Sequence, residues 1–206
     1  MLRLTSGLFC TLAVSIFAFG SEGTIKSEPP IRIECYGKLR SGVMAIGAET
    51  TGTTINVEGT TWELALKNDA AKTFAETHDK KPVSVSGSLR RVAGVEVPAR
   101  WIVDVEKLSE WDARTNKTSA SVTVAGRLRT DVSSKGGTTK PVLEANGIQW
   151  QLDFAADTAL KTKAESLAQT PIMVTGTIER VPVNARHQNL IIHVSKLDAS
   201  SDSIEK

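Results

Sequence analysis

The few side chains that could support catalysis or metal binding are scattered through this sequence. The histidines His78, His187 and His193 have no cysteine or second histidine at a ligand spacing, and a metal site needs three or four converging ligands. Asp104 and Glu106 alternate along one predicted strand, where paired carboxylates could do acid–base chemistry. However, no nucleophile has a base at a recognisable spacing, and no glycine-rich phosphate loop precedes a predicted helix. We therefore expect a protein that is not an enzyme and has neither a metal site nor a cofactor.

Basic side chains are the better candidates for ligand binding. They recur at equivalent positions of the two halves of the sequence, as the pairs Lys38 and Arg127, Arg40 and Arg129, and Arg91 and Arg180. If they lie on neighbouring strands, they form one basic patch in each half, which could hold an acidic glycan, an anionic lipid head group or an acidic protein surface. The alternative is a solvated face that protects strand edges and keeps the protein soluble.

Aromatic side chains and the cysteine indicate a core more than a site. Trp62 and Trp150 alternate with leucines, which predicts that both point inward. Cys35 has a valine at its equivalent position in the second half, which favours a small buried side chain over a reactive thiol. Only Tyr36 and Trp111 remain as candidates for exposed rings on which a base or a sugar could stack.

The sequence contains two copies of one unit, separated by an offset of 88 or 89 residues. Four blocks carry the repeat, and each pair shares its glycine, aromatic or apolar positions. The pairs are IECYGKLR (33–40) with VTVAGRLR (122–129), GTTWEL (59–64) with GIQWQL (147–152), PVSVSGSLRRV (82–92) with PIMVTGTIERV (171–181), and WIVDVEKL (101–108) with LIIHVSKL (190–197).

Alternating apolar residues predict five strands in each copy, with a helical stretch between the third and the fourth. The helical stretches run from Asn68 to about Lys80 and from Asp157 onward, and Pro82 and Pro171 end them. This order is that of an OB-fold, and glycines inside the strands suit a tightly coiled barrel. We therefore predict a mainly β protein with two tandem five-stranded OB-like barrels, each with one short helix.

The strand motifs also resemble a known family. The G-x-L first strand, the aromatic-x-L third strand, the V-x-V-x-G fourth strand and the I-x-V-x-x-L ending are similar to the periplasmic bacterial OB-fold (BOF-like) proteins. This sequence departs from that family in carrying two copies and a helix after the third strand. The resemblance implies a module that binds a ligand or a partner, and not a catalyst.

The N-terminal residues have the pattern of an export signal. A basic start at Arg3, an apolar run from Leu8 to Phe19 and a small-x-small exit at Ala18-Phe19-Gly20 predict a signal peptide over residues 1–20, and a secreted or periplasmic protein. The apolar run is shorter than the roughly 20 residues of a membrane span, although an uncleaved anchor is the alternative. Cleavage leaves a formal charge of +1 in place of +2, and a single cysteine, Cys35.

The domain prediction follows from the repeat and from composition. We expect a first domain over 31–108, a linker over 109–120, a second domain over 121–197 and a disordered tail over 198–206. The near-neutral charge argues against nucleic acid as the partner. The predicted export and the recurring basic residues lead us to expect an envelope protein or an anionic glycan instead, with no membrane span after cleavage. The alternative is a structural spacer in an envelope assembly that has no soluble ligand.

Overall fold

The computed structural model describes residues 28–44, 49–94, 99–114, 117–130, 140–184 and 187–200. The predicted signal peptide lies outside these residues. Within them, no helix combines the length and the apolar character that a membrane crossing requires. The elements are β1 (Ile31–Ser41), β2 (Thr53–Val57), β3 (Thr60–Ala65), α1 (Asp69–Thr77), β4 (Pro82–Val92), β5 (Arg100–Glu110), β6 (Ser119–Arg129), β7 (Val142–Ala145), β8 (Ile148–Asp153), α2 (Thr158–Ser166), β9 (Pro171–Asn184) and β10 (His187–Ala199).

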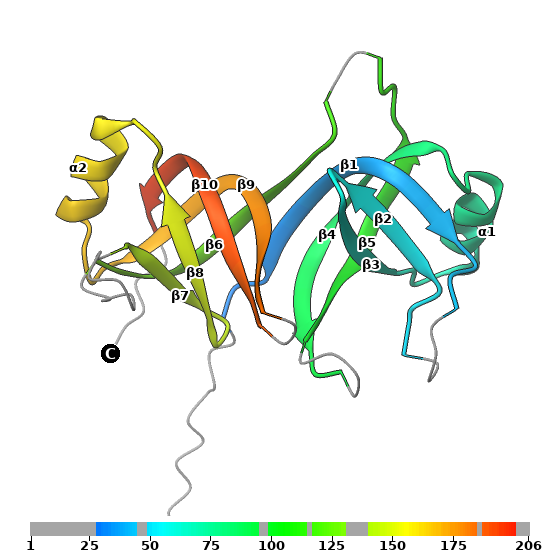
Figure 1. Cartoon of the computed structure of the whole chain (residues 1–206), viewed down its shortest axis with the longest axis horizontal. Helices are drawn as coiled ribbons and strands as arrows, with labels where there is room; N and C mark the ends of the chain where they lie inside the picture. The colour runs from blue at the N-terminus through cyan, green and yellow to red at the C-terminus, as the bar shows by residue number, and fades with distance from the viewer. Residues whose placement is uncertain are drawn as a thin grey trace, which may run out of the picture.

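Strand pairing closes a five-stranded barrel. The strands lie in the order β2-β3-β5-β4-β1, and β1 pairs again with β2. All pairs are antiparallel except β3 with β5, which is parallel. The second half of the chain repeats this pairing in the order β6-β7-β8-β10-β9, with β9 returning to β6 (Figure 1). The prediction of a mainly β fold with a five-stranded barrel is confirmed.

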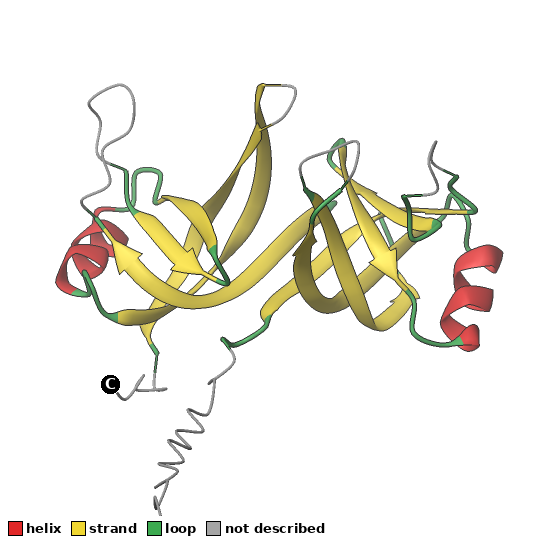
Figure 2. Ribbon diagram, turned by 90° about the horizontal axis from the view of Figure 1, so that it is seen from below, coloured by secondary structure: helices red, strands yellow, loops and turns green. Residues whose placement is uncertain are grey.

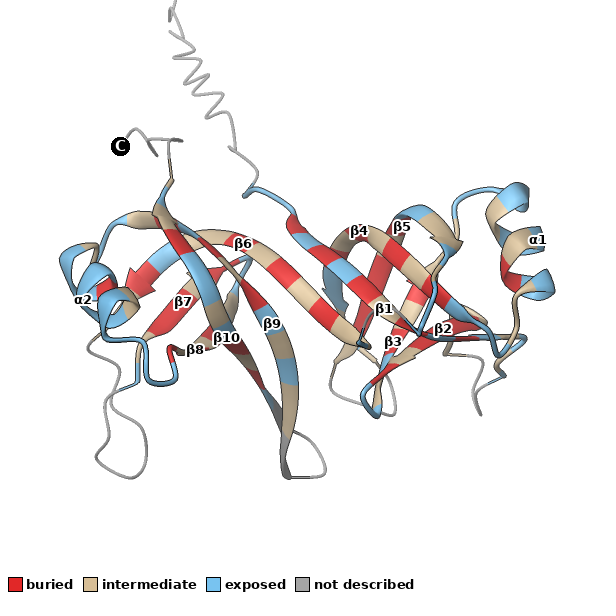
Figure 3. Ribbon diagram, turned by 90° about the horizontal axis from the view of Figure 1, so that it is seen from above, coloured by how far each residue is buried: buried red, intermediate tan, exposed pale blue. Residues whose placement is uncertain are grey.

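Alternation of apolar and polar residues explains why these segments form half-buried strands. In β1, every second residue from Ile31 to Leu39 is buried, and the residues between them face outward. Figure 3 shows the same alternation of buried and exposed residues along the other strands. The buried residues of both halves form one apolar cluster.

Each helix begins at a side-chain cap and covers one barrel. Asn68 accepts a hydrogen bond from the backbone N–H of Ala71 at 2.8 Å, and Asp157 does the same for Leu160 at 2.9 Å. Ala75 in α1 and Ala164 in α2 are the buried helical residues. The two helices lie at opposite ends of the long axis of the molecule (Figure 2).

The two halves share one sheet. β1 pairs antiparallel with β6, so that Ile33 lies opposite Val122 and Cys35 lies opposite Ala120. Paired residues point to the same side of a sheet, so both apolar cores lie on one side of the β4-β1-β6-β9 sheet. Its other side is a continuous outer face.

This pairing changes the predicted boundaries. Residues 109–110 belong to β5 and residues 119–120 belong to β6, so the connection between the strands is shorter than the predicted linker 109–120. The tail predicted to begin at residue 198 is wrong at its start, because Asp198 and Ala199 pair with β9. Residues 201–206 lie outside the described residues.

Candidate ligand-binding faces

Two of the predicted basic residues lie on the outer face of the first barrel. Lys38 is opposite Asn56, and Arg40 is opposite Thr54, in the pairing of β1 with β2. The β2–β3 register extends these two rows to β3. We call this surface the barrel-1 face; its accessible outward residues are Lys38, Arg40, Asn56, Thr61 and Glu63, whereas Thr54 points outward but is buried. It includes strands two and three, the surface on which OB-folds bind oligonucleotides and oligosaccharides.

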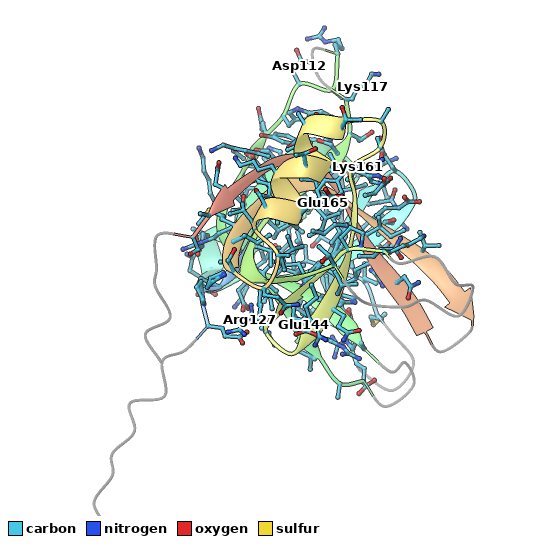
Figure 4. The ribbon with its side chains drawn as sticks, turned by 90° about the vertical axis from the view of Figure 1, so that its left-hand side faces the viewer. Asp112, Lys117, Arg127, Glu144, Lys161 and Glu165 are labelled. Atoms are coloured by element: carbon cyan, nitrogen blue, oxygen red, sulfur yellow. The ribbon has the colours of Figure 1, made fainter. Side chains whose placement is uncertain are left out.

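The second barrel presents the same arrangement. Arg127 lies opposite Glu144, and the two are seen close together in Figure 4. Arg129 lies opposite Val142 and forms an ion pair with Glu144 at 3.4 Å. We call this surface the barrel-2 face; its accessible outward residues are Arg127, Arg129, Glu144, Gln149 and Gln151, whereas Val142 points outward but is buried. Each face therefore carries two cations at equivalent positions of its first strand.

Arg91 and Arg180 do not lie with the paired cations of their own barrels. β4 runs antiparallel to β1 with Pro82 opposite Lys38, so Arg91 lies at the far end of β4 from Lys38 and Arg40. The same holds for Arg180, because Pro171 at the start of β9 is opposite Arg127. The prediction that these arginines complete one patch per half is corrected by this register.

The side chain of Arg180, on β9 of the second barrel, instead contacts β3 of the first barrel. Its guanidinium donates a hydrogen bond to the backbone carbonyl of Thr61 at 2.8 Å and lies 5.2 Å from the ring centre of Trp62. Burial lowers the pKa of Arg180. Its equivalent, Arg91, is exposed and lines a hollow of about 310 Å³ between the barrels, with Asn146 and Ile148 on the opposite wall.

Acidic side chains neutralise part of the barrel-1 face. Arg100 donates two hydrogen bonds to Glu63, at 2.8 and 2.5 Å, and this lowers the pKa of Glu63. Arg90 pairs with Asp104 at 2.8 Å. Ile102 lies between these ion pairs, at an outward position of β5, but it is only 4% exposed. The long charged side chains around it exclude water from its outward position.

The aromatic predictions separate into core and surface as expected. Trp62 and Trp150 are fully buried. Trp101 is buried as well and contacts Trp150 across the two barrels, with ring centroids 5.8 Å apart. Tyr36 and Trp111 are half-buried and contact each other, with ring centroids 5.7 Å apart. Sequence spacing does not reveal this contact, because the two residues lie in different segments.

Among the described residues, two further titratable groups lie in a core position and in an ion-pair cluster. Cys35 is buried, and burial raises the pKa of its thiol to about 12, which leaves it protonated and unreactive. His193 bridges Asp153 and Glu179 through its two ring nitrogens, at 3.0 and 2.9 Å. Over the part of the chain that the structure describes, no group of three His, Cys, Asp or Glu side chains could hold a metal ion.

Comparison with known proteins finds structural but not sequence relatives. No protein-family model matches the chain, and no curated protein matches it. A deletion mutant of the single-stranded DNA-binding protein from Thermus aquaticus matches with a TM-score of 0.55 and 13% identity, over 86% of this chain and 98% of that chain. The wild-type protein matches with a TM-score of 0.52 and 13% identity, over 87% and 97%.

This likeness corrects the expectation that nucleic acid is not a partner. That expectation came from the net charge of the whole chain, whereas both matching structures are of a protein named for binding single-stranded DNA. Net charge does not report how cations are placed on one face. Single-stranded DNA-binding proteins are built on OB-folds. The chain therefore has the OB-fold that its strand order predicted.

Proposed function

We propose that this protein is a non-catalytic binding module in which two tandem OB domains hold single-stranded nucleic acid. The observation that carries the proposal is the pair of cations on each face, Lys38 with Arg40 and Arg127 with Arg129, at equivalent positions of the surface on which OB-folds bind ligands. The name of the matching Thermus protein supports this choice of ligand.

The faces suit contact with phosphates more than recognition of bases. Lysine and arginine side chains neutralise phosphates without reading sequence, and their contacts release counterions. Glu144 on the barrel-2 face competes for Arg129, whereas Glu63 on the barrel-1 face is already paired with Arg100. We therefore expect sequence-independent binding that weakens with salt, with a dissociation constant of about 10⁻⁴ to 10⁻⁶ M at physiological salt.

The proposed site of action is outside the cytoplasm. The basic start, the apolar run and the small residues Ala18 and Gly20 support export through a signal peptide. Two linked domains raise the affinity for a long strand when both engage it at once.

The test is a titration of the full chain with labelled oligo(dT) at several salt concentrations. Replacing Lys38 and Arg40 by alanine, or Arg127 and Arg129, should weaken binding and reduce the slope of log affinity against log salt by about 0.7 per lost phosphate contact. Lys72 and Lys161 are exposed on the helices, away from both faces, and serve as matched charge controls. No binding at low salt would contradict the proposal and favour a structural spacer.

A further inference from the structure

An aromatic pair lies next to the barrel-1 face. Tyr36 precedes Lys38 by two positions on β1, so both side chains point to the outer side of the same strand. Trp111 begins the connection that follows β5, and its ring contacts Tyr36 at an interplanar angle of 46°. About 7 Å of strand separates Tyr36 from Lys38, a span that one nucleotide of an extended strand can bridge.

The cross-strand neighbours of Tyr36 are small. Tyr36 lies between Ser84 on β4 and Ser119 on β6 in the strand register. The hydroxyl of Ser84 bonds to that of Ser109 at 2.8 Å, so it stays close to the sheet. The Tyr36 hydroxyl donates to the carboxylate of Glu34 at 2.5 Å, which fixes the orientation of the phenol ring.

The second barrel lacks an equivalent pair. The position equivalent to Tyr36 is Ala125, one residue before the shared glycine. Trp111 lies in the segment between the two copies and so belongs to neither repeat. Aromatic character at this place is therefore particular to the first barrel and is not a requirement of the OB architecture.

From these contacts we infer that Tyr36 and Trp111 form a stacking site for one base of a single strand whose phosphates Lys38 and Arg40 hold. This inference rests on the proposed function. Stacking on an aromatic ring tolerates any base, because every base has a π-face. Such a site is therefore as independent of sequence as the phosphate contacts of Lys38 and Arg40. A ring held by a second ring and by a hydrogen bond is ordered before the ligand arrives, so less entropy is lost on binding.

The experiment compares oligo(dT) with an abasic deoxyribose-phosphate strand of the same length, which has the phosphates but no bases. The full chain should bind oligo(dT) more tightly than the abasic strand. Tyr36→Ala and Trp111→Ala should each weaken oligo(dT) binding by roughly 5- to 150-fold and leave binding of the abasic strand unchanged. Trp111→Phe keeps a ring and should retain most of the preference for bases.

A matched control separates this site from the phosphate contacts. Replacing Lys38 and Arg40 by alanine should weaken binding of both strands by the same factor. Equal affinity for both strands in the full chain, with no effect of the aromatic variants, would overturn the stacking site and leave strand binding intact. Binding of neither strand would overturn both proposals. If the aromatic variants weakened binding of a neutral glucan oligomer as much as binding of oligo(dT), the inference that the rings stack on a base would be overturned. Unchanged melting temperatures confirm that each variant is folded.

Discussion

At the scale of single residues, the two equivalent tryptophans show what the core requires. Trp62 and Trp150 are 1% and 0% exposed, and their indole N–H groups have no hydrogen-bond acceptor among the described residues. Their contribution is therefore apolar packing. Trp62→Ala or Trp150→Ala should lower the free energy of unfolding by about 3 to 5 kcal/mol, measured by urea denaturation. Replacement by phenylalanine should cost less, because it also removes an unpaired buried donor. A loss within about 0.5 kcal/mol for alanine would contradict the inward assignment.

His193 gives the stability a dependence on pH. Hydrogen bonds to Glu179 and to Asp153 raise the pKa of His193 above its ordinary value of about 6.5. A histidine whose pKa is raised by folding stabilises the protein fully below its unfolded pKa, and this contribution disappears as the pH rises through the folded pKa.

The full chain should therefore melt at a higher temperature than the His193→Gln variant. This difference in melting temperature should be largest near pH 6, where the carboxylates are charged, and should approach zero at about pH 9. The difference should be small because the His193 side chain is 43% exposed and water screens the pair. An advantage that grows with pH would contradict this sign.

At the scale of elements, glycines decide how closely the strands coil. A Cβ atom on Gly37 would lie 2.3 Å from the backbone carbonyl oxygen of Asn56, and one on Gly126 would lie 2.4 Å from that of Glu144. Backbone cannot move aside cheaply, so Gly37→Ala and Gly126→Ala should each destabilise the protein by about 1 to 3 kcal/mol or more. Ser86→Ala, at an outward strand position, is the control for thermal melting. Equal melting temperatures for all three variants would contradict this account.

The order of the elements could be predicted from the sequence because side-chain alternation reports which face of a strand is buried. The alternation in β1 and the cap at Asn68 are such local signals, and both match the structure. The pairing of β1 with β6 could not be predicted, since backbone hydrogen bonds between strands of two different barrels leave no pattern in the amino-acid sequence. The sequence also named Lys38, Arg40 and Arg91 as candidates for one patch. It could not show that the antiparallel register of β1 and β4 places Arg91 at the opposite end of β4 from Lys38 and Arg40.

At the scale of the whole molecule, the contacts between the halves are not symmetric. Arg180 fills its side of the interface by contacting Trp62 and the carbonyl of Thr61, whereas the equivalent Arg91 faces an open hollow. Together with the β1–β6 pairing, this contact fixes how the two ligand-binding faces are oriented to each other. A strand that spans both faces would then meet a preformed surface, which lowers the entropy lost on binding.

This asymmetry predicts different effects for two equivalent substitutions. Arg180→Ala removes a hydrogen bond from a charged donor and a cation–π contact, and should lower the free energy of unfolding by about 1 to 3 kcal/mol in urea denaturation. Arg91→Ala should change it by no more than about 0.5 kcal/mol, because the side chain is exposed. Small-angle scattering should show a larger radius of gyration for Arg180→Ala only, as the barrels loosen. Equal effects of the two variants would mean that the Arg180 contact adds nothing to the β1–β6 pairing and the Trp101–Trp150 contact in holding the barrels together.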